Sequence, residues 1–250
     1  MILISLCLFI ILTLSSNKAA SAYDDSISTA ASSNLITSIP PVPESQFVFY
    51  SSKDGQISSN GLSQADYIFE YLNPNGSIYY QAIFQKKLPE NITSTEKYNS
   101  IFLAPEFNYK SIDNIPLNFT KPAGSIFVNF NSLLSSSSSL VSSNFIYSNG
   151  KYYHYKDKSK DIDGLNNAPV CVSNVIIQIS NTSVTENNLN SIKGNGKGYL
   201  FTGGRGIEIK WNKEDSNPIK ISDSNNNPVF LTNGSIWWII IDSESSVVYN

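Results

Sequence analysis

Cysteine is scarce in this sequence, which limits how the fold can be held together. Of two cysteines among 250 residues, Cys7 lies in an N-terminal apolar run that we expect to be removed, which leaves Cys171 alone. A single cysteine cannot form an internal disulfide. The sequence places no cation beside Cys171 that would make it a reactive nucleophile, so we expect a buried structural thiol in a fold held by packing.

Positive charge is also sparse. Arg205 is the single arginine, the lysines are scattered, and the net charge is -3. Nucleic acid is bound by cations clustered against phosphates, and anionic membrane surfaces attract the same kind of cluster. The composition therefore excludes nucleic acid as an expected partner and disfavours anionic membranes.

Histidine occurs once, as His154 in the stretch KYYHYKDK. One histidine without a cysteine cluster cannot build a His-based zinc site. Asp157, Asp161 and Asp163 lack the spacing of a calcium-binding EF-hand loop, and the glycine-rich stretch 194–206 lacks the Lys-Ser/Thr ending of a nucleotide loop. We therefore expect no metal and no cofactor, a solvated turn at the aspartates, and a place for His154 on a strand surface.

The N-terminus has the plan of a secretory signal peptide. An apolar run over 2–14 is followed by the small residues Ala20-Ser21-Ala22, so we predict a signal peptide at 1–22. The alternative is an uncleaved anchor, although the run is shorter than the ~20 residues that span a bilayer. A serine-rich flexible tether is predicted over 23–46. We expect a secreted or extracytoplasmic envelope protein, without a transmembrane helix after signal removal.

The folded part begins near Phe47 and contains a strong hairpin signal. Two runs rich in Tyr, Ile and Phe, 67–72 and 77–84, flank the turn-forming sequence Asn73-Pro74-Asn75-Gly76. Alternation along the first strand places Glu70 between two apolar neighbours on one face.

Asp66 and Glu70 raise the question of acid/base catalysis. Two carboxylates share that work when their environments separate their pKa values and both face one cleft. We expect Asp66 to close a helical turn over 61–66 as the capping-box partner of Ser63. Glu70 is expected to accept hydrogen bonds within the sheet, because a buried unpaired carboxylate is costly. A cell-wall hydrolase that uses Glu70 and Asp66 is the alternative function.

The C-terminal half predicts strand after strand, separated by turn-forming Gly, Asn, Asp and Pro. The expected strands are 125–130, 145–147, 151–155, 170–179, 198–201, 206–212, 219–222, 228–231 and 236–242. The predicted fold class is α+β and β-dominated, with two packed lobes. A mixed α/β N-terminal lobe at 47–123, with a short helix over 95–103, accompanies an antiparallel β-rich C-terminal lobe at 124–250.

The chain resembles the YerB-like family of bacterial envelope lipoproteins, a domain of unknown function. The resemblance rests on an ordered series of stretches: GLSQADYIFEYL, YYHYKDKSKDID, VSNVIIQ, GNGKGYLFTGGRGIEIKWNKED and NNPVFLTNGSIWWIII. Together they cover most of 47–242. The resemblance implies a cell-envelope protein with an α/β lobe followed by a β-rich lobe, and it supplies no established activity.

The chain looks shortened relative to the family and lacks its arginine-rich motifs. Ser58-Ser59 stands where members show Arg-Pro, and Tyr79 replaces an arginine of the second hairpin strand. The segment 95–99 replaces a Val-Arg-Ser-Ala-Arg run. A family function that rests on these cations is therefore not expected of this chain.

Tyrosines on the predicted strands are suited to recognition, because exposed aromatic rings stack on glycans or pack against proteins. We predict a non-catalytic binding or assembly factor for a cell-wall glycan or another envelope protein. The candidate binding residues are Tyr79, Tyr153, His154, Asp163 and Asn174. The weaker catalytic candidates are Glu70, Asp66 and His154.

Overall fold

The computed structural model describes residues 44–51, 59–72, 76–92, 96–100, 102–114, 119, 121–130, 142–156, 158–181, 189, 192–215 and 217–250. The predicted signal peptide and residues 23–43 of the predicted tether lie outside these ranges. Within them, no helix has the length and apolar character that a bilayer crossing requires.

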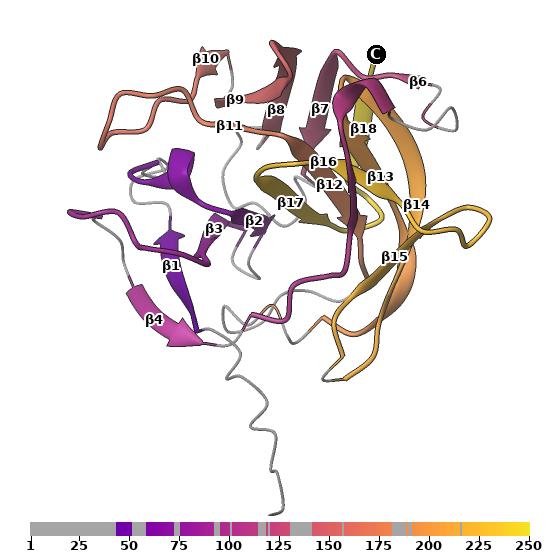
Figure 1. Cartoon of the computed structure of the whole chain (residues 1–250), viewed down its shortest axis with the longest axis horizontal. Helices are drawn as coiled ribbons and strands as arrows, with labels where there is room; N and C mark the ends of the chain where they lie inside the picture. Colours follow the sequence, from indigo (N-terminus) through magenta and orange to yellow (C-terminus); the bar gives the residue numbers. More distant parts are fainter. Residues whose placement is uncertain are drawn as a thin grey trace, which may run out of the picture. The chain divides into compact units, whose positions relative to one another are not determined.

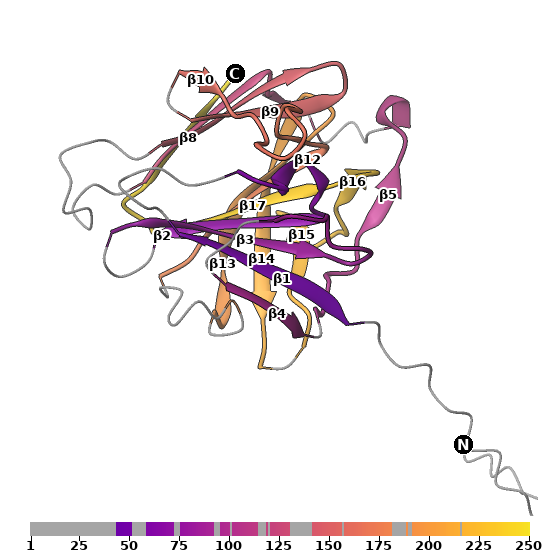
Figure 2. The same cartoon turned by 90° about the vertical axis from the view of Figure 1, so that its left-hand side faces the viewer.

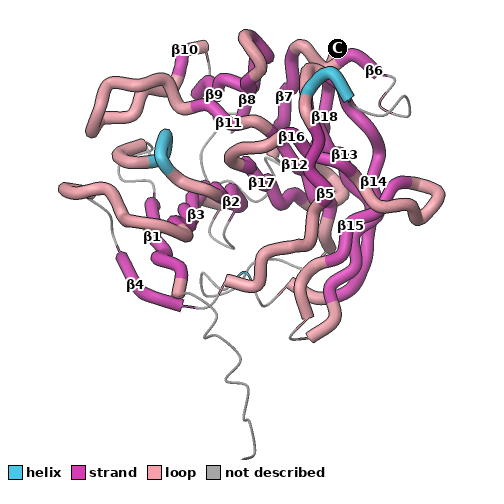
Figure 3. The backbone as a smooth tube through the Cα atoms, in the orientation of Figure 1, coloured by secondary structure: helices cyan, strands magenta, loops and turns pink. Residues whose placement is uncertain are grey.

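Strands account for almost all the regular structure of the described residues. They are β1 (Ser45–Ser51), β2 (Tyr67–Leu72), β3 (Ile78–Phe84), β4 (Glu96–Ser100), β5 (Asn108–Lys110), β6 (Lys121–Pro122), β7 (Ser125–Asn129), β8 (Ser142–Ser148), β9 (Lys151–Lys156), β10 (Ser159–Lys160), β11 (Cys171–Val172), β12 (Asn174–Ile179), β13 (Gly194–Thr202), β14 (Arg205–Lys213), β15 (Lys220–Asp223), β16 (Phe230–Thr232), β17 (Ile236–Ile241) and β18 (Ser246–Tyr249). The helical segments in this part of the chain are two 3₁₀ turns, η1 (Leu62–Gln64) and η2 (Ile112–Asn114), drawn in cyan in Figure 3.

The largest sheet has ten strands and joins segments that are far apart in the sequence. Its order is β15-β14-β13-β12-β17-β2-β3-β1-β4, with β6 beside β14. β2 and β3 form the predicted hairpin. β17 lies between β12 and β2 and runs parallel to both, as Figure 1 shows. The sheet therefore depends on one strand near the C-terminus to connect its two halves.

A second sheet of six strands packs on one face of the large sheet. Its order is β10-β9-β8-β7-β18, with β11 beside β9. Ile68 and Trp237 of the large sheet form one buried cluster with Val128, Phe145 and Tyr152 of the second sheet. Figure 2 shows β8 and β9 lying over β2 and β17. The two sheets thus form a sandwich whose interior is this cluster.

The other face of the large sheet carries a second buried cluster, which includes Phe69, Ile176 and Trp238. Side chains alternate along a strand, so β17 supplies Trp237 to the first cluster and Trp238 to the second. Apolar residues of the 102–107 segment pack on this second face, and Leu231 of the small β16-β5 sheet belongs to its cluster. Both faces of the sheet are therefore apolar.

The β-dominated fold is confirmed, but the finer architecture is not. The described residues of 47–123 hold strands and 3₁₀ turns, so a mixed α/β lobe is not confirmed. Two packed lobes are not confirmed either, because β2 and β17 come from the two predicted lobes and are neighbours in one sheet. The C-terminal half is not wholly antiparallel, because β12 and β17 pair in parallel.

The predicted helix over 95–103 is wrong, because part of this segment forms β4 and pairs with β1. The Tyr98 ring stacks on Phe47 with 5.0 Å between ring centroids. Gln81 of β3 donates from its Nε2 to the Tyr98 hydroxyl at 2.7 Å. These partners are distant in the sequence, and their contacts outweigh the local helical preference of a short segment.

Separate expression of residues 47–123 and 124–250 tests whether either half folds alone. We expect neither fragment to unfold cooperatively by circular dichroism, because each lacks the neighbour that covers the edge of β2 or of β17. Mixing the two fragments should restore a cooperative transition. A cooperative transition in either isolated fragment would instead support the two predicted lobes.

Candidate functional site

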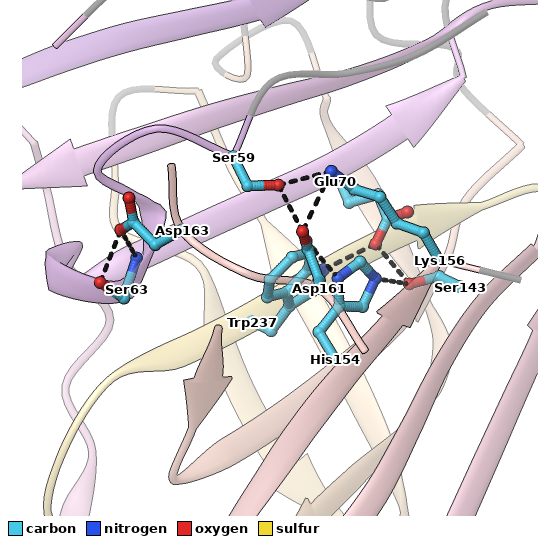
Figure 4. Close-up of polar contacts among 9 residues, drawn as sticks. All are labelled: Ser59, Ser63, Glu70, Ser143, His154, Lys156, Asp161, Asp163 and Trp237. Carbon is cyan, nitrogen blue, oxygen red and sulfur yellow. Dashed lines mark hydrogen bonds and ion pairs between the residues drawn. The ribbon is translucent and has the colours of Figure 1, made fainter. Parts of the chain in front are cut away.

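Glu70 lies in the interior of the sandwich and is fully buried. Its Oε2 accepts hydrogen bonds from the Ser143 hydroxyl at 2.8 Å and from the Trp237 indole N–H at 2.6 Å. Trp237 comes from the neighbouring strand β17, whereas Ser143 comes from β8 of the second sheet (Figure 4). The carboxylate therefore links the two sheets.

His154 extends the same chain of contacts. It points from β9 into the sandwich, where its Nε2 lies 3.1 Å from the Ser143 hydroxyl oxygen. Its Nδ1 lies 2.9 Å from Oδ2 of Asp161. The imidazole stacks on the Trp237 indole with 4.2 Å between ring centroids. The order serine, histidine, aspartate is that of a hydrolase triad.

Asp161 ends the chain of contacts nearest to the surface. Its Oδ1 accepts a hydrogen bond from Ser59 at 2.6 Å and lies 3.2 Å from the Lys156 ammonium, which also donates to Ser59. Burial acts to raise the pKa of Asp161. The hydrogen bond and charge of His154, the charge of Lys156 and the hydrogen bond from Ser59 together outweigh burial, so the pKa of Asp161 lies below its ordinary value. Asp161 is therefore held as a carboxylate.

We call this set the buried polar network; it comprises Ser59, Glu70, Ser143, His154, Lys156, Asp161 and Trp237. One proton is shared within it. If Ser143 donates to Glu70, Nε2 of His154 must donate to Ser143; if Nε2 accepts, Glu70 must carry the proton. In both states the charges of Glu70, His154, Asp161 and Lys156 sum to zero. A neutral network avoids the cost of an uncompensated buried charge.

Burial dominates the electrostatics of Glu70. It raises the pKa of the carboxyl group, although the charge of His154, the hydrogen bonds from Ser143 and Trp237 and the charge of Lys156 partly offset it. The second oxygen, Oε1, is buried and has no hydrogen-bond partner in the described part of the chain. Burial therefore holds the pKa of Glu70 above its ordinary value.

The geometry of the buried polar network does not offer a substrate a way in. Ser143 is 0% exposed and His154 is 1% exposed. The hydroxyl of Ser143 is engaged by Glu70 as well as by His154, and Trp237 covers the imidazole. A triad acts on a carbonyl that reaches its serine beside an oxyanion hole. The arrangement is therefore that of a structural connection between sheets.

Several predicted environments are wrong. His154 was expected on a strand surface, and Asp161 and Asp163 in a solvated turn, yet all three are buried. Asp157, the third residue of that turn, lies outside the described residues. Alternation along β9 explains the result for His154, because His154 and Tyr152 share the inward face.

Asp163 forms a second buried contact between distant segments. Its Oδ1 accepts from the backbone N–H of Gly61 at 2.8 Å and of Leu165 at 2.9 Å. Its Oδ2 accepts from the backbone N–H of Ser63 at 3.0 Å and from the Ser63 hydroxyl at 2.6 Å. Gly61 has a positive φ of 87°, and an added Cβ would lie 2.8 Å from the Ile92 side chain. The aspartate therefore fixes the η1 turn.

The predicted capping box is consequently wrong. Gly61, not Ser63, is the N-cap of η1, and the Ser63 hydroxyl binds Asp163. Asp66 instead accepts the backbone N–H of Gln85 at 2.8 Å through its Oδ2. Glu70 belongs to the buried polar network, whereas Asp66 is not one of its members. The structure thus does not bring the two hydrolase candidates together.

The remaining candidate binding residues differ in exposure. Asn174 is fully buried; its amide donates to the Thr232 carbonyl at 2.9 Å and accepts from the Thr202 hydroxyl at 2.7 Å, so it joins strands. Tyr79 is half-buried, with its ring 6.5 Å from that of Phe49. Tyr153 is half-buried on the outward face of β9. Binding by Tyr79 and Tyr153 stays a prediction.

Sequence reasoning did not find Ser143, Ser59 or Lys156 as members of the buried polar network. Ser143 ends the serine-rich stretch LLSSSSSLVSS, which predicts a loop and gives no sign that one serine is buried. The burial of Ser143 can be predicted only if β8 is recognised as a strand that includes it. Side chains two residues apart in a strand share a face, and Ser143 and Phe145 both face inward.

Comparison with known proteins identifies the kind of domain. Residues 132–238 match the family described as "Protein of unknown function (DUF3048) C-terminal domain". The crystal structure of the YerB protein from Bacillus subtilis matches with a TM-score of 0.56 and 14% identity, over 83% of this chain and 95% of that chain. No curated protein matches the sequence. The chain therefore contains a YerB-like domain of unknown function, as the sequence resemblance predicts.

The variant Glu70→Gln tests the buried carboxyl group. The wild-type chain should lose stability as the pH rises from about 4.5 through the higher folded pKa of Glu70, because the unfolded chain ionises first. Glutamine cannot ionise, yet its amide oxygen can accept from Ser143 and Trp237. We expect the free energy of unfolding of the variant to rise relative to wild type across that window, measured by denaturant titration at a series of pH values.

The matched control is Glu208→Gln, which changes an exposed glutamate 3.5 Å from Lys121 on the same large sheet. Its stability should follow wild type throughout the pH series. Parallel curves for wild type and Glu70→Gln would mean that Glu70 titrates alike in the folded and unfolded chains.

Proposed function

We propose that this chain is an exported cell-envelope protein that binds another envelope protein without catalysing a reaction. The proposal places the partner on the outward face of the six-stranded sheet, which we call the outer aromatic face. It comprises Phe127, Ile146, Tyr153, Tyr155 and Val248. The export step rests on the predicted signal peptide at 1–22.

The observation that carries the proposal is a group of exposed apolar side chains on one sheet face. Val248 is 59% exposed, Ile146 42% and Phe127 41%. Val248 pairs with Phe127, and Ile146 pairs with Tyr153, so cross-strand register places the members on the same side. Contiguous exposed apolar residues mark interaction surfaces in soluble proteins.

The tyrosines favour a protein partner over a glycan. Lys160 lies over the Tyr153 ring, 4.7 Å from its centroid, and 5.9 Å from the centroid of Tyr155. A sugar that stacks on these rings would have to displace the ammonium from the faces that it covers. A protein surface can instead pack on the apolar members and pair an acidic group with Lys160.

Catalysis is not part of the proposal. The serine, histidine and aspartate that resemble a triad lie within the sandwich, and Glu70 and Asp66 make separate contacts. The charges that a hydrolase would use are therefore engaged in holding the fold together.

The double variant Phe127→Ser/Val248→Ser tests the outer aromatic face. We expect the full chain to retain an envelope protein in a cross-linking pull-down from membrane extract, and the double variant to lose it at least tenfold, because the apolar contact area is removed. Purified cell-wall glycan serves as the second bait and should not be retained.

The control Ile112→Ser changes a residue that is 43% exposed on η2 and is not a member of the outer aromatic face. It should retain the partner as wild type does, and denaturant unfolding should show all three chains equally folded. Equal retention by the double variant, or retention of glycan alone, would contradict the proposal.

A further inference from the structure

A hollow lies on the face of the large sheet that is turned away from the second sheet. Its walls are largely apolar, and their aromatic members are Phe47, Phe69, Tyr98, Phe102 and Trp238. These residues come from β1, β2, β4, β17 and the 102–107 segment. None of them belongs to the buried polar network or to the outer aromatic face, so the hollow is independent of the function proposed above.

The aromatic walls are held by contacts among themselves. Phe69 stacks on Trp238 with 5.5 Å between centroids and an angle of 24° between the planes. Phe102 meets Phe69 edge to face at 6.0 Å. Rings that are fixed in this way present a preformed apolar surface, which binds an apolar ligand with little cost in ordering.

Gln178 supplies a hydrogen-bond donor to the hollow. The side chain is 2% exposed, and its Oε1 accepts from the Trp238 indole N–H at 3.0 Å. An indole N–H can only donate, so this bond fixes the orientation of the amide. Gln178 lines the hollow, and its Nε2 is buried without a hydrogen-bond partner among the described residues. A buried amide donor without a partner is costly, which points to an acceptor on a ligand.

Lys213 adds positive charge to the same lining. Its ammonium donates to the backbone carbonyls of Asp215 at 2.8 Å and Asn217 at 2.7 Å, which use two of its three N–H bonds. In the described part of the chain no carboxylate lies within ion-pair distance of it; Asp215 pairs with Lys193 at 2.7 Å. The charge of Lys213 is therefore not neutralised by a salt bridge here.

Gln81 gives the hollow a second polar position. Its Nε2 donates to the Tyr98 hydroxyl at 2.7 Å, and its Oε1 is buried without a partner in the described ranges. Gln81 and Gln178 lie on β3 and β12, which are three strand positions apart. That is roughly 14 Å along a flat sheet. An elongated apolar ligand with a hydroxyl at its far end would satisfy this acceptor too.

We infer that the hollow binds a small apolar carboxylate, of the size of a medium-chain fatty acid, with its body on the Phe69 and Trp238 rings and its carboxylate toward Gln178 and Lys213. The aromatic walls select the apolar body. The unpartnered amide donor and the lysine select an anion over a cation of the same length.

Titration calorimetry of the full chain with decanoate, below its micelle concentration, tests the inference. We expect saturable binding of one decanoate per chain, and binding of decyltrimethylammonium at least tenfold weaker. Gln178→Leu removes the free donor and should weaken decanoate binding about tenfold, the effect of one hydrogen bond to a charged group. The matched control, Gln64→Leu, makes the same change at an exposed residue of η1 and should bind as wild type does.

Lys213→Met provides a second variant at a position outside the apolar core, in case Gln178→Leu does not fold, and it should weaken decanoate binding at least threefold. No saturable binding of decanoate, equal binding of the ammonium compound, or unchanged affinity in both folded variants would overturn the inference. The pull-down of an envelope protein uses the opposite side of the sandwich, so its outcome is separate from this one.

Discussion

The parallel pairing of β17 with β2 and β12 is the constraint on which the rest of the structure depends. It brings the strand 236–241 between segments that lie much earlier in the sequence. Because side chains alternate, the strand also sends one tryptophan to each face. Trp237 donates to Glu70 in the sandwich, and Trp238 donates to Gln178 at the hollow. One strand therefore contributes a tryptophan to the buried polar network and another to the hollow.

The buried polar network shows how a fold can carry the residues of a catalytic triad without the chemistry. Ser143, His154 and Asp161 have the order and the spacing of such a triad, but their neighbours are the opposite sheet, a tryptophan ring and a second carboxyl group. Removing any one member would leave a buried polar group without its partner, which costs more than the intact contact contributes. We infer that the network fixes the registration of the two sheets, because sliding one sheet would break several of these bonds together.

Local patterns predicted the local structure well. The Asn-Gly turn and the alternation from Tyr67 to Phe84 predicted the hairpin with its faces, and the spaced β-prone runs predicted most C-terminal strands. The family resemblance was confirmed for the same reason, since it rests on the order of these runs. The apolar run IWWIII indicates a strand buried on both faces, but nothing in it states which strands lie beside it.

The candidate site was harder to predict because its members meet only through that long-range pairing. Glu70 was expected to accept hydrogen bonds within the sheet, and one of its two donors, Trp237, does lie on a neighbouring strand. His154 was expected on a surface because the second sheet that covers it could not be read from KYYHYKDK. The unpartnered amide of Gln178 likewise becomes visible only when Trp238 is placed beside it.

The reactivity of Ser143 tests the central claim most directly. Incubation of the full, folded chain with a fluorophosphonate that labels activated serines, followed by peptide mass spectrometry, reports whether that hydroxyl can act as a nucleophile. The account predicts no phosphonyl adduct on Ser143, because the residue is 0% exposed and its hydroxyl is hydrogen-bonded to the Glu70 carboxyl group. An adduct at Ser143 in the folded chain that disappears in a His154→Ala variant would contradict it.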